Sequence, residues 1–213
     1  MSNTNVDVLI IGAGPSGCVA ASYLHKNGLK IKVVEKNKFP RFAIGESLLP
    51  RCMDHFDEVG LLECLKKQEF EIKNGARFLK EDVVCNFDFS EKHTKGWDWT
   101  WQVPRADFDK TLTDELIKNG VDITFEEEVV DVVFSEDGTS VTTIKNKEQK
   151  TKTIEAKFII DSSGFGRVLP RLLDLDAPSA IPEHSSIFTH VKDIKRPKGK
   201  EGTIITFDVI NKD

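Results

Sequence analysis

The sequence has few cysteines, no long apolar segment and no excess of basic charge. Its four cysteines form no CxxC pair and have no histidine at metal-binding spacing, so we expect reduced thiols and no metal site. The apolar runs are strand-sized, which argues against a transmembrane helix. The net charge of −5 argues against nucleic acid as a partner. Because the opening segment, Met1 to Asn5, is polar and unlike a secretory signal, we expect a cytoplasmic protein without a membrane partner.

The sequence also lacks an obvious set of catalytic residues. Its five histidines are scattered and form neither an HExxH motif nor a triad order, and no internal repeat is present. With 213 residues, the chain has room for one large domain or one and a half small ones. These absences leave the glycine-rich opening of the chain as its most informative feature.

A short apolar run, a glycine-rich turn and a helical segment open the chain. Residues 6–11 indicate a buried parallel strand, because they are apolar, rich in β-branched side chains and followed by a glycine. The turn Gly12-Ala-Gly-Pro-Ser-Gly17 leads into a helical pattern that ends at the Asn27-Gly28 pair. A second apolar strand, Ile31 to Val34, ends at Glu35. This order predicts the βαβ unit that binds dinucleotides.

Each residue type in this unit has a physical task. Gly12 allows the tight turn, Gly14 lets a pyrophosphate approach the backbone, and Gly17 lets the helix pack close to the sheet. The N-terminus of the helix offers free N–H groups and partial positive charge to phosphates. Glu35 follows Gly12 by 23 positions, where its carboxylate can accept both hydroxyls of an adenosine ribose and would repel a 2′-phosphate. The unit alone does not distinguish FAD from NAD.

Further segments resemble the flavin-dependent halogenases and their relatives among the class A flavoprotein monooxygenases. Residues 39–50, FPRFAIGESLLP, are similar to the FPRxxIGESLLP segment that runs along the flavin in that family. Residues 156–167 are similar to its strand and D-x-x-G turn, and residues 103–109 to a helix start whose arginine contacts FAD. Together with residues 12–35, which resemble the FAD version of the fingerprint, they imply the N-terminal portion of a glutathione-reductase-type FAD fold.

The resemblance also implies which residues hold FAD. Gly45 would permit close approach to the flavin, and Ser47 would cap the next helix and reach a phosphate or ribityl oxygen. A simple loop with a helix cap is the alternative for this segment, and a surface cation is the alternative for Arg105. The implied cofactor-binding residues are Gly12, Gly14, Pro15, Ser16, Gly17, Glu35, Lys36, Arg41, Gly45, Glu46, Ser47, Arg105, Val129, Asp161 and Gly164.

All three tryptophans fall in one short segment, at positions 97, 99 and 101. Period-two spacing places the three rings on one face of a strand, where packing against a helix would be a sufficient explanation. The segment Trp99-Thr-Trp101-Gln-Val103-Pro104 is also similar to the WxWxIP motif of the flavin-dependent halogenases. The resemblance implies that Trp99 and Trp101 keep the substrate away from the flavin.

The halogenases use a lysine that captures hypohalous acid or delivers it by hydrogen bond. In several members it follows a G-A-x-F-like strand, which here reads Gly75-Ala-Arg-Phe78 and is followed by Leu79. Lys73 and Lys80 are the candidate catalytic residues. Alternation along a strand points Lys80 away from Leu79, and Lys73 would serve only if the backbone bends. Solvated surface positions are the alternative for both lysines.

The fold class that follows is α/β: a Rossmann-like, three-layer ββα domain of the FAD/NAD(P)-binding type with part of an antiparallel-sheet substrate domain. We assign residues 1–75 and 101–170 to the FAD-binding domain and residues 76–100 and 171–213 to the partial substrate domain. Nothing matches the family's second FAD motif, so we expect a chain truncated at its C-terminus. The other expected elements are helices over 48–70 and 106–118, strands within 75–89 and over 97–103, a β-meander over 121–157 with a turn at Asp137-Gly138, a parallel strand over 158–161, and antiparallel strands over 186–191 and 203–210.

The resemblance implies an FAD-dependent oxidoreductase. Reduced flavin would react with O2 to give a C4a-hydroperoxide that transfers oxygen to halide or to a small organic substrate, while the protein supplies positioning and a dry pocket. Electrons would come from NAD(P)H or from a separate flavin reductase, which would then be a partner. Two alternatives stay open: an FAD-dependent reductase of isoprenoid double bonds, and a non-catalytic FAD-binding fragment that needs its missing half.

Overall fold

Four parallel strands form the centre of the molecule. The computed structural model describes residues 4–182 and 184–209. Each neighbouring pair of the four strands is parallel, and β2 is buried along its whole length, so both faces of this sheet are covered. Covered strands are continuous apolar runs, which is why residues 6–11 and 31–34 show no alternation. In spatial order the strands are β7 (Asp122–Phe125), β2 (Ile31–Glu35), β1 (Thr4–Ile11) and β10 (Thr151–Asp161).

Strand β10 also belongs to a second, antiparallel layer. Its first half pairs with β9 (Ser140–Asn146), which pairs in turn with β8 (Glu127–Phe134). The β8–β9 turn contains the Asp137-Gly138 pair, as predicted, and the Thr139 amide donates to the Asp137 carboxylate at 3.0 Å. Apolar side chains of β8, β9 and β10 form one hydrophobic cluster with those of β1 and β2. The antiparallel layer therefore covers one face of the parallel sheet.

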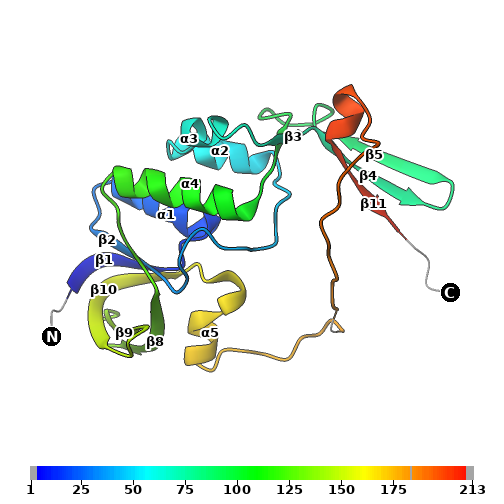
Figure 1. Ribbon diagram of the computed structural model, residues 1–213. Coiled ribbons are helices and arrows are strands. Elements are labelled where there is room, and N and C mark those ends of the chain that lie inside the picture. Colours follow the sequence, from blue (N-terminus) through cyan, green and yellow to red (C-terminus); the bar gives the residue numbers. More distant parts are fainter. Residues whose placement is uncertain (1–3, 183, 210–213) are drawn as a thin grey trace.

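Helices cover the opposite face (Figure 1). Helices α1 (Pro15–Lys26) and α4 (Arg105–Lys118) lie against the sheet, and α2 (Arg51–Glu58) and α3 (Leu62–Lys66) pack beside them. Their apolar side chains, with Phe108 among the fully buried ones, form the larger hydrophobic cluster with β1 and β2. The three layers confirm the predicted ββα architecture. Among the described residues, no helix is both long and apolar enough to cross a membrane.

Two small sheets lie beyond the helices. Strand β3 (Glu71–Lys73) pairs antiparallel with β6 (Thr100–Gln102), and β4 (Gly75–Lys80) pairs antiparallel with β5 (Val83–Asp88). After β10 the chain forms the 3-10 turn η1 (Gly164–Gly166) and the short helix α5 (Val168–Leu172). Residues 174–198, which we call the strap, have no helix or strand where they are described. Figure 1 shows the strap running from α5 to the 3-10 turn η2 (Gly199–Thr203) and β11 (Ile204–Asp208), which joins the β4–β5 pair.

Several predicted strands are wrong in pairing or extent. Strand β7 adds in parallel to β2 instead of joining the antiparallel meander, because side-chain patterns do not determine which sheet edge a strand joins. Residues 186–191 form no strand and lie exposed in the strap. Strand β11 pairs in parallel with β4, not antiparallel, and Ile210 lies outside the described residues. Of the predicted strand 97–103, only Thr100–Gln102 is paired in a sheet.

The helical predictions hold better, because they rest on local periodicity. Helix α4 begins one residue before the predicted 106–118 segment, and the predicted strands within 75–89 are β4 and β5. The segment 48–70 is two short helices, α2 and α3, separated at Gly60, which has positive φ. Ser47 does not cap α2, which begins at Arg51 after Pro50. Ser47 instead forms a β-bridge with Gln102, so a long-range contact replaces the predicted local one.

Candidate functional site

The carboxyl ends of β1, β2 and β10 open into a cavity of about 640 Å³. This volume is typical of a small-molecule or cofactor site, and the carboxyl edge is where open parallel sheets bind ligands. The GxGxxG turn, the loop after β2, the start of α4, β8 and the turn after β10 complete the walls. The predicted cofactor-binding residues that line the cavity are Gly12, Gly14, Pro15, Ser16, Glu35, Lys36, Arg41, Arg105, Val129 and Gly164.

Gly12 and Gly17 close the turn between β1 and α1. Gly12 has a φ of +99°, and a Cβ built on it would lie 2.6 Å from the carbonyl oxygen of Ser162. A Cβ on Gly17 would lie 2.0 Å from the Gly12 carbonyl oxygen, so α1 approaches the strand only because this position has no side chain. A Cβ on Gly14, in contrast, would meet no atom within 4 Å. Gly14 therefore leaves the space beside the α1 N-terminus open to a ligand.

Glu35 fastens the end of β2 to the glycine turn. It is buried, and its Oε2 accepts a hydrogen bond from the Ala13 amide at 2.9 Å. Its Oε1 accepts bonds from the backbone amide and the side-chain amide of Asn37 at 2.8 and 3.0 Å. A carboxylate has about four lone-pair sites, so Glu35, which lines the cavity, can accept a further hydrogen bond. The next residue, Lys36, pairs with Glu128 of β8 at 2.8 Å and holds the pKa of that carboxyl below its usual range.

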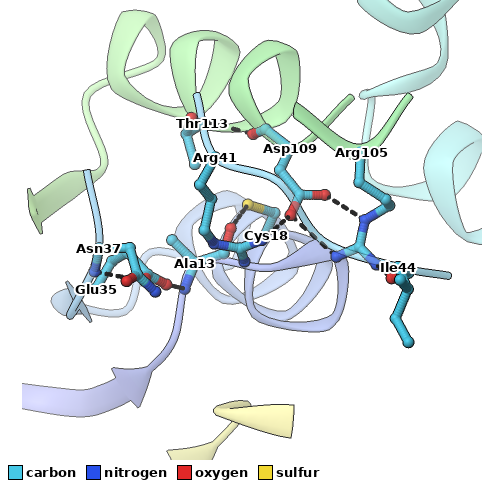
Figure 2. Close-up of polar contacts among 9 residues, drawn as sticks. All are labelled: Ala13, Cys18, Glu35, Asn37, Arg41, Ile44, Arg105, Asp109 and Thr113. Atoms are coloured by element: carbon cyan, nitrogen blue, oxygen red, sulfur yellow. Dashed lines mark hydrogen bonds and ion pairs between the residues drawn. The ribbon is translucent and has the colours of Figure 1, made fainter. Parts of the chain in front are cut away.

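Two arginines of the cavity wall share one buried carboxylate (Figure 2). Arg105, the first residue of α4, donates from Nε and Nη2 to the two oxygens of Asp109 at 2.8 and 3.0 Å. Arg41, in the loop after β2, brings Nη1 to 3.2 Å from Oδ2 of Asp109. Its guanidinium also lies 4.6 Å from the centroid of the Phe39 ring. The two guanidinium groups together carry one more unit of charge than the carboxylate that they share.

Asp161 does not line the cavity but builds the turn that does. Its Oδ1 accepts a hydrogen bond from the Ser163 amide at 2.9 Å, and its Oδ2 accepts one from the Leu169 amide at 2.8 Å. These bonds hold the backbone from the end of β10 to the start of α5, which places Gly164 in the cavity wall. The D-x-x-G pattern therefore has a local structural reason at this position.

The loop of residues 39–50 is held by the start of α4 and by β6. The Ile44 carbonyl accepts a hydrogen bond from Nη1 of Arg105 at 2.8 Å, and the Glu46 carbonyl accepts one from the Val103 amide at 2.8 Å. A Cβ on Gly45 would lie 3.1 Å from Nη1 of Arg105, so the loop passes close to this guanidinium. Gly45 and Glu46 directly follow Ile44, which lines the cavity, but they do not line it themselves.

Lys73 joins this loop to the small β3–β6 sheet. It is 4% exposed, and its Nζ donates to Ser47 Oγ at 2.8 Å and to the Leu48 carbonyl at 2.9 Å. The surface interpretation is therefore wrong for Lys73, because the loop covers its side chain. Burial lowers the pKa of its ammonium group. Lys80 ends β4 and is exposed, which agrees with the surface interpretation for that residue.

The three tryptophan rings contact one another in sequence. Trp97 and Trp99 meet edge to face with centroids 5.5 Å apart, and Trp99 and Trp101 do so at 5.2 Å. Trp101 is buried and contacts Phe70 at 6.3 Å, so the row of rings packs against the larger hydrophobic cluster. The rings therefore have a packing role whatever they do to a substrate.

The residues that line the cavity all lie within the part of the chain that one protein-family model matches. The model of the family described as FAD binding domain matches residues 5–199, which include the glycine turn, the 39–50 loop, the start of α4 and the turn after β10.

The chain belongs to the FAD-binding domain family.

Relatives of the chain include halogenases. A 1H-pyrrole-2-carbonyl-[peptidyl-carrier protein] chlorinase of Pseudomonas fluorescens is 33% identical over 82% of this chain and 43% of its own length. The crystal structure of a flavoprotein/dehydrogenase from Cytophaga hutchinsonii matches with a TM-score of 0.87 and 52% identity, over 96% of this chain and 50% of that one. The flavin-dependent halogenase CmlS matches with a TM-score of 0.73 and 36% identity, over 82% and 32%. The chain therefore spans half or less of the length of these relatives.

The donors and acceptors of the cavity fit FAD. A helix N-terminus with open space beside Gly14 and two guanidinium groups suit a diphosphate, and Glu35 suits ribose hydroxyls. The buried Nε of Arg41 has no hydrogen-bond partner among the described residues, which leaves one more donor. Gly17, Asp161 and Ser47 act behind this surface rather than in it. Lining residues that sequence reasoning missed include Asn37, Ile44, Ser163, Phe165 and Arg171.

Some of these missed residues had a signal in the sequence. Ile44 lies inside the 39–50 segment, and Ser163 and Phe165 flank Gly164, so the rule that ligands meet strand ends points to them. Arg171 carried no such signal, because it lies beyond the 156–167 segment and in none of the other motifs of the sequence. In the structure it belongs to α5, which turns back against β8 and places Arg171 in the cavity wall.

Proposed function

We propose that the cavity binds FAD and that this chain carries the cofactor site of an FAD-dependent oxidoreductase of the monooxygenase or halogenase type. The observation that supports the proposal is the convergence, in one cavity, of an open glycine turn, a buried acid at the end of β2 and two fixed guanidinium groups. Membership of the FAD-binding domain family and the halogenases among its relatives support it independently.

The proposed roles follow from position. Gly14, Pro15 and Ser16 would present the α1 N-terminus to the diphosphate, with Arg41 and Arg105 as its cationic partners. Glu35 would accept the ribose hydroxyls, while Gly12, Gly17 and Asp161 would shape the backbone around the cofactor. Lys36, Val129 and Gly164 would form the remaining walls, and Gly45, Glu46 and Ser47 would lie toward the flavin ring.

Bound FAD would supply electron transfer and the reaction with O2. The protein's contribution would be to exclude water and to separate substrate from cofactor. We propose Trp99 and Trp101 for this separation, since their rings contact each other at the start of β6, the strand whose Gln102 forms a bridge with Ser47 of the 39–50 loop. We propose Lys73 rather than Lys80 as the catalytic lysine, because only Lys73 is buried against Ser47 of that loop.

The surroundings of the reaction are part of the proposal. The substrate would be a small organic molecule, and the electrons would come from NAD(P)H or from a separate flavin reductase. A cytoplasmic location is supported by four cysteines that all carry free thiols.

We also propose the division into a cofactor unit, residues 1–75 and 101–170, and a substrate unit, residues 76–100 and 171–213. Its support is that all buried members of both hydrophobic clusters fall in the first unit.

A second candidate function is a reduction that uses bound FAD without O2. An FAD-dependent reductase of isoprenoid double bonds would use the same cofactor site but would need neither O2 nor a halide. Lys73 would then serve only to hold the 39–50 loop.

Flavin titration and oxygen uptake together test these proposals. The wild-type chain is expected to quench flavin fluorescence on binding FAD, and the reduced complex is expected to consume O2 and to oxidise bromide faster than free reduced flavin does. A chain that cannot be reconstituted with FAD would overturn the cofactor site. FAD binding without oxygen uptake above that of free flavin, combined with reduction of an isoprenoid double bond, would favour the second candidate.

The lysine assignment predicts different effects for two variants. Lys73→Met should leave FAD binding within about twofold and lower bromination of an organic acceptor by about 100-fold or more, the usual scale for loss of a group that acts by hydrogen bond or proton transfer, because the lysine would capture or deliver hypobromous acid after bromide has been oxidised. Lys80→Met is the matched control, because it removes the same group from an exposed strand end. Equal losses in the two variants, or none in Lys73→Met, would contradict the assignment.

A further inference from the structure

We infer that Asp109 is a positioning residue for the cofactor: it holds the guanidinium groups of Arg41 and Arg105 together at the cavity wall so that both face the FAD diphosphate. This inference rests on the proposed FAD site and adds to it a residue that lies behind the cavity surface. It concerns a carboxylate that touches the two arginines and that does not itself line the cavity.

The geometry is that of one acceptor serving two forked donors. Arg105 meets the Asp109 carboxylate with two hydrogen bonds, at 2.8 and 3.0 Å, one helical turn apart on α4. Arg41 reaches Oδ2 at 3.2 Å from a loop that is more than sixty residues away in sequence. Figure 2 shows Asp109 between the two guanidinium groups, with Arg41 toward Ala13 of the glycine turn and Arg105 toward Ile44.

Burial makes this contact strong and its loss costly. Asp109 is 1% exposed, and the side chains of Arg41 and Arg105 are 22% and 14% exposed. Two cations brought close together in a poorly hydrated wall repel each other, and a shared carboxylate removes most of that repulsion. Both guanidinium groups keep further N–H donors, since a guanidinium has five and the carboxylate uses only some of them.

The placement of the two cations has a chemical target. Oxidised FAD carries its charge on the diphosphate, whereas the adenosine and riboflavin parts are neutral. An arrangement that presents two guanidinium groups beside the N-terminus of α1 therefore recognises the diphosphate and not the ring systems. Asp109, a carboxylate, would repel that diphosphate if it faced the cavity, so its position behind the arginines is the one in which it helps.

A merely structural role for Asp109 makes a different prediction. If it only supported α4, its loss would weaken every ligand of the cavity to a similar degree. If it positions the arginines, its loss weakens only ligands that contain the diphosphate. The comparison of ADP with adenosine, and of FAD with riboflavin, separates the two roles.

The experiment is a calorimetric titration of the 213-residue chain and of Asp109→Asn with these four ligands. Asp109→Asn keeps the shape of the side chain and removes its charge. We expect FAD and ADP to bind about 10- to 100-fold more weakly to the variant, the scale of a lost charge-assisted hydrogen bond, and adenosine and riboflavin to change less than about twofold. Asp114→Asn, on the exposed side of the same helix, is the matched control and should bind all four ligands like the wild type.

Each other outcome overturns the inference in a recognisable way. Unchanged ADP binding by Asp109→Asn, or an equal loss for ADP and adenosine, would reject the positioning role while leaving the FAD site intact. Failure of the wild-type chain to bind either FAD or ADP would reject the proposed FAD site and the inference with it. Should Asp109→Asn not fold, as judged by its thermal transition, Asp109→Glu keeps the charge but shifts it, and the same selective loss for ADP is expected.

Discussion

The part of the molecule that carries the cavity and the part made of the β11-β4-β5 sheet and the strap differ in how far they bury their apolar side chains. We call these two parts the cofactor side and the far side. Between the helices, the parallel sheet and the antiparallel layer, two hydrophobic clusters contain the fully buried large apolar side chains of the described residues, Phe108 among them. In the β11-β4-β5 sheet and the strap, large apolar side chains such as Phe87, Val83 and Ile187 are exposed. The first side is therefore stabilised by its own core, whereas the second depends on local contacts.

The local contacts of the far side are ring contacts and exposed ion pairs, and each of them contributes little to stability. Phe78 stacks on Phe207 with centroids 4.8 Å apart and meets Phe87 edge to face at 5.6 Å. Exposed ion pairs join η2 and the strap to the neighbouring strands, as in Lys200–Asp88 and Arg196–Glu71, and such pairs are usually worth at most about 1 kcal/mol. Because few buried contacts hold the far side, we expect the elements around the diphosphate end of the proposed site to be rigid and the far side to adjust more easily.

The largest expected effect is a loss of stability on the cofactor side, measured against an aromatic residue of the far side. Phe108→Ala removes a ring that is 0% exposed and should lower the free energy of unfolding by about 3–5 kcal/mol. Phe87→Ala removes a ring that is 55% exposed and should lower it by less than about 1 kcal/mol. Urea denaturation followed by tryptophan fluorescence measures both, and equal losses would contradict the difference in burial between the two sides.

Limited proteolysis should show the same difference without a mutation. Because the strap lacks helix and strand hydrogen bonds where it is described, a protease that cuts after lysine and arginine should cleave it first, at Lys192 or Lys195. The helices and the six-stranded sheet should persist as a fragment that mass spectrometry identifies. First cleavage within α1 or β2 would contradict the assignment of the stable side.

The smallest expected effect is a dependence of stability on pH, through the carboxyl of Asp88 in the far side. Lys200, together with Ser90, lowers the pKa of Asp88 to about 2. A carboxyl whose pKa is lower in the folded state stabilises that state above its unfolded pKa and loses this contribution as the pH falls toward 2. A carbon NMR titration of Asp88 should therefore show a low midpoint, which Lys200→Met should raise; a midpoint near 4 in the wild type would contradict the ion pair.

What the sequence predicted well depends on short-range rules. The glycine turn, the end of β2 at Glu35, helix α4 and the Asp161 turn are each specified by residues within a few positions, and their geometry follows the expected one. What it predicted poorly depends on partners distant in the chain. The burial of Lys73 needs Ser47, and the role inferred for Asp109 needs Arg41, and no spacing rule brings these pairs together.

Strand pairing shows the same limit. An alternating or apolar run establishes that a strand exists, but β7 and β11 each joined a partner in parallel where an antiparallel neighbour was expected. The row of tryptophans was predicted from period two and is present as a row of ring contacts. The strand in this segment, β6, is shorter than predicted, because only Thr100–Gln102 pair with β3.

The pairing of β1 with β10 has a consequence for how the chain acquires its site. Thr4 pairs with Ile154, so the first strand stays without this neighbour until some 150 further residues are available. Parallel pairing over such a separation is slow, because a long loop must close before the contact gives any stability. The glycine turn can form early, since β1, α1 and β2 are adjacent in sequence, but Ser162 and Gly164 complete the cavity only after β10 docks. We therefore expect refolding in stopped-flow experiments to show secondary structure before FAD binding, with the capacity to bind FAD appearing in the last kinetic phase.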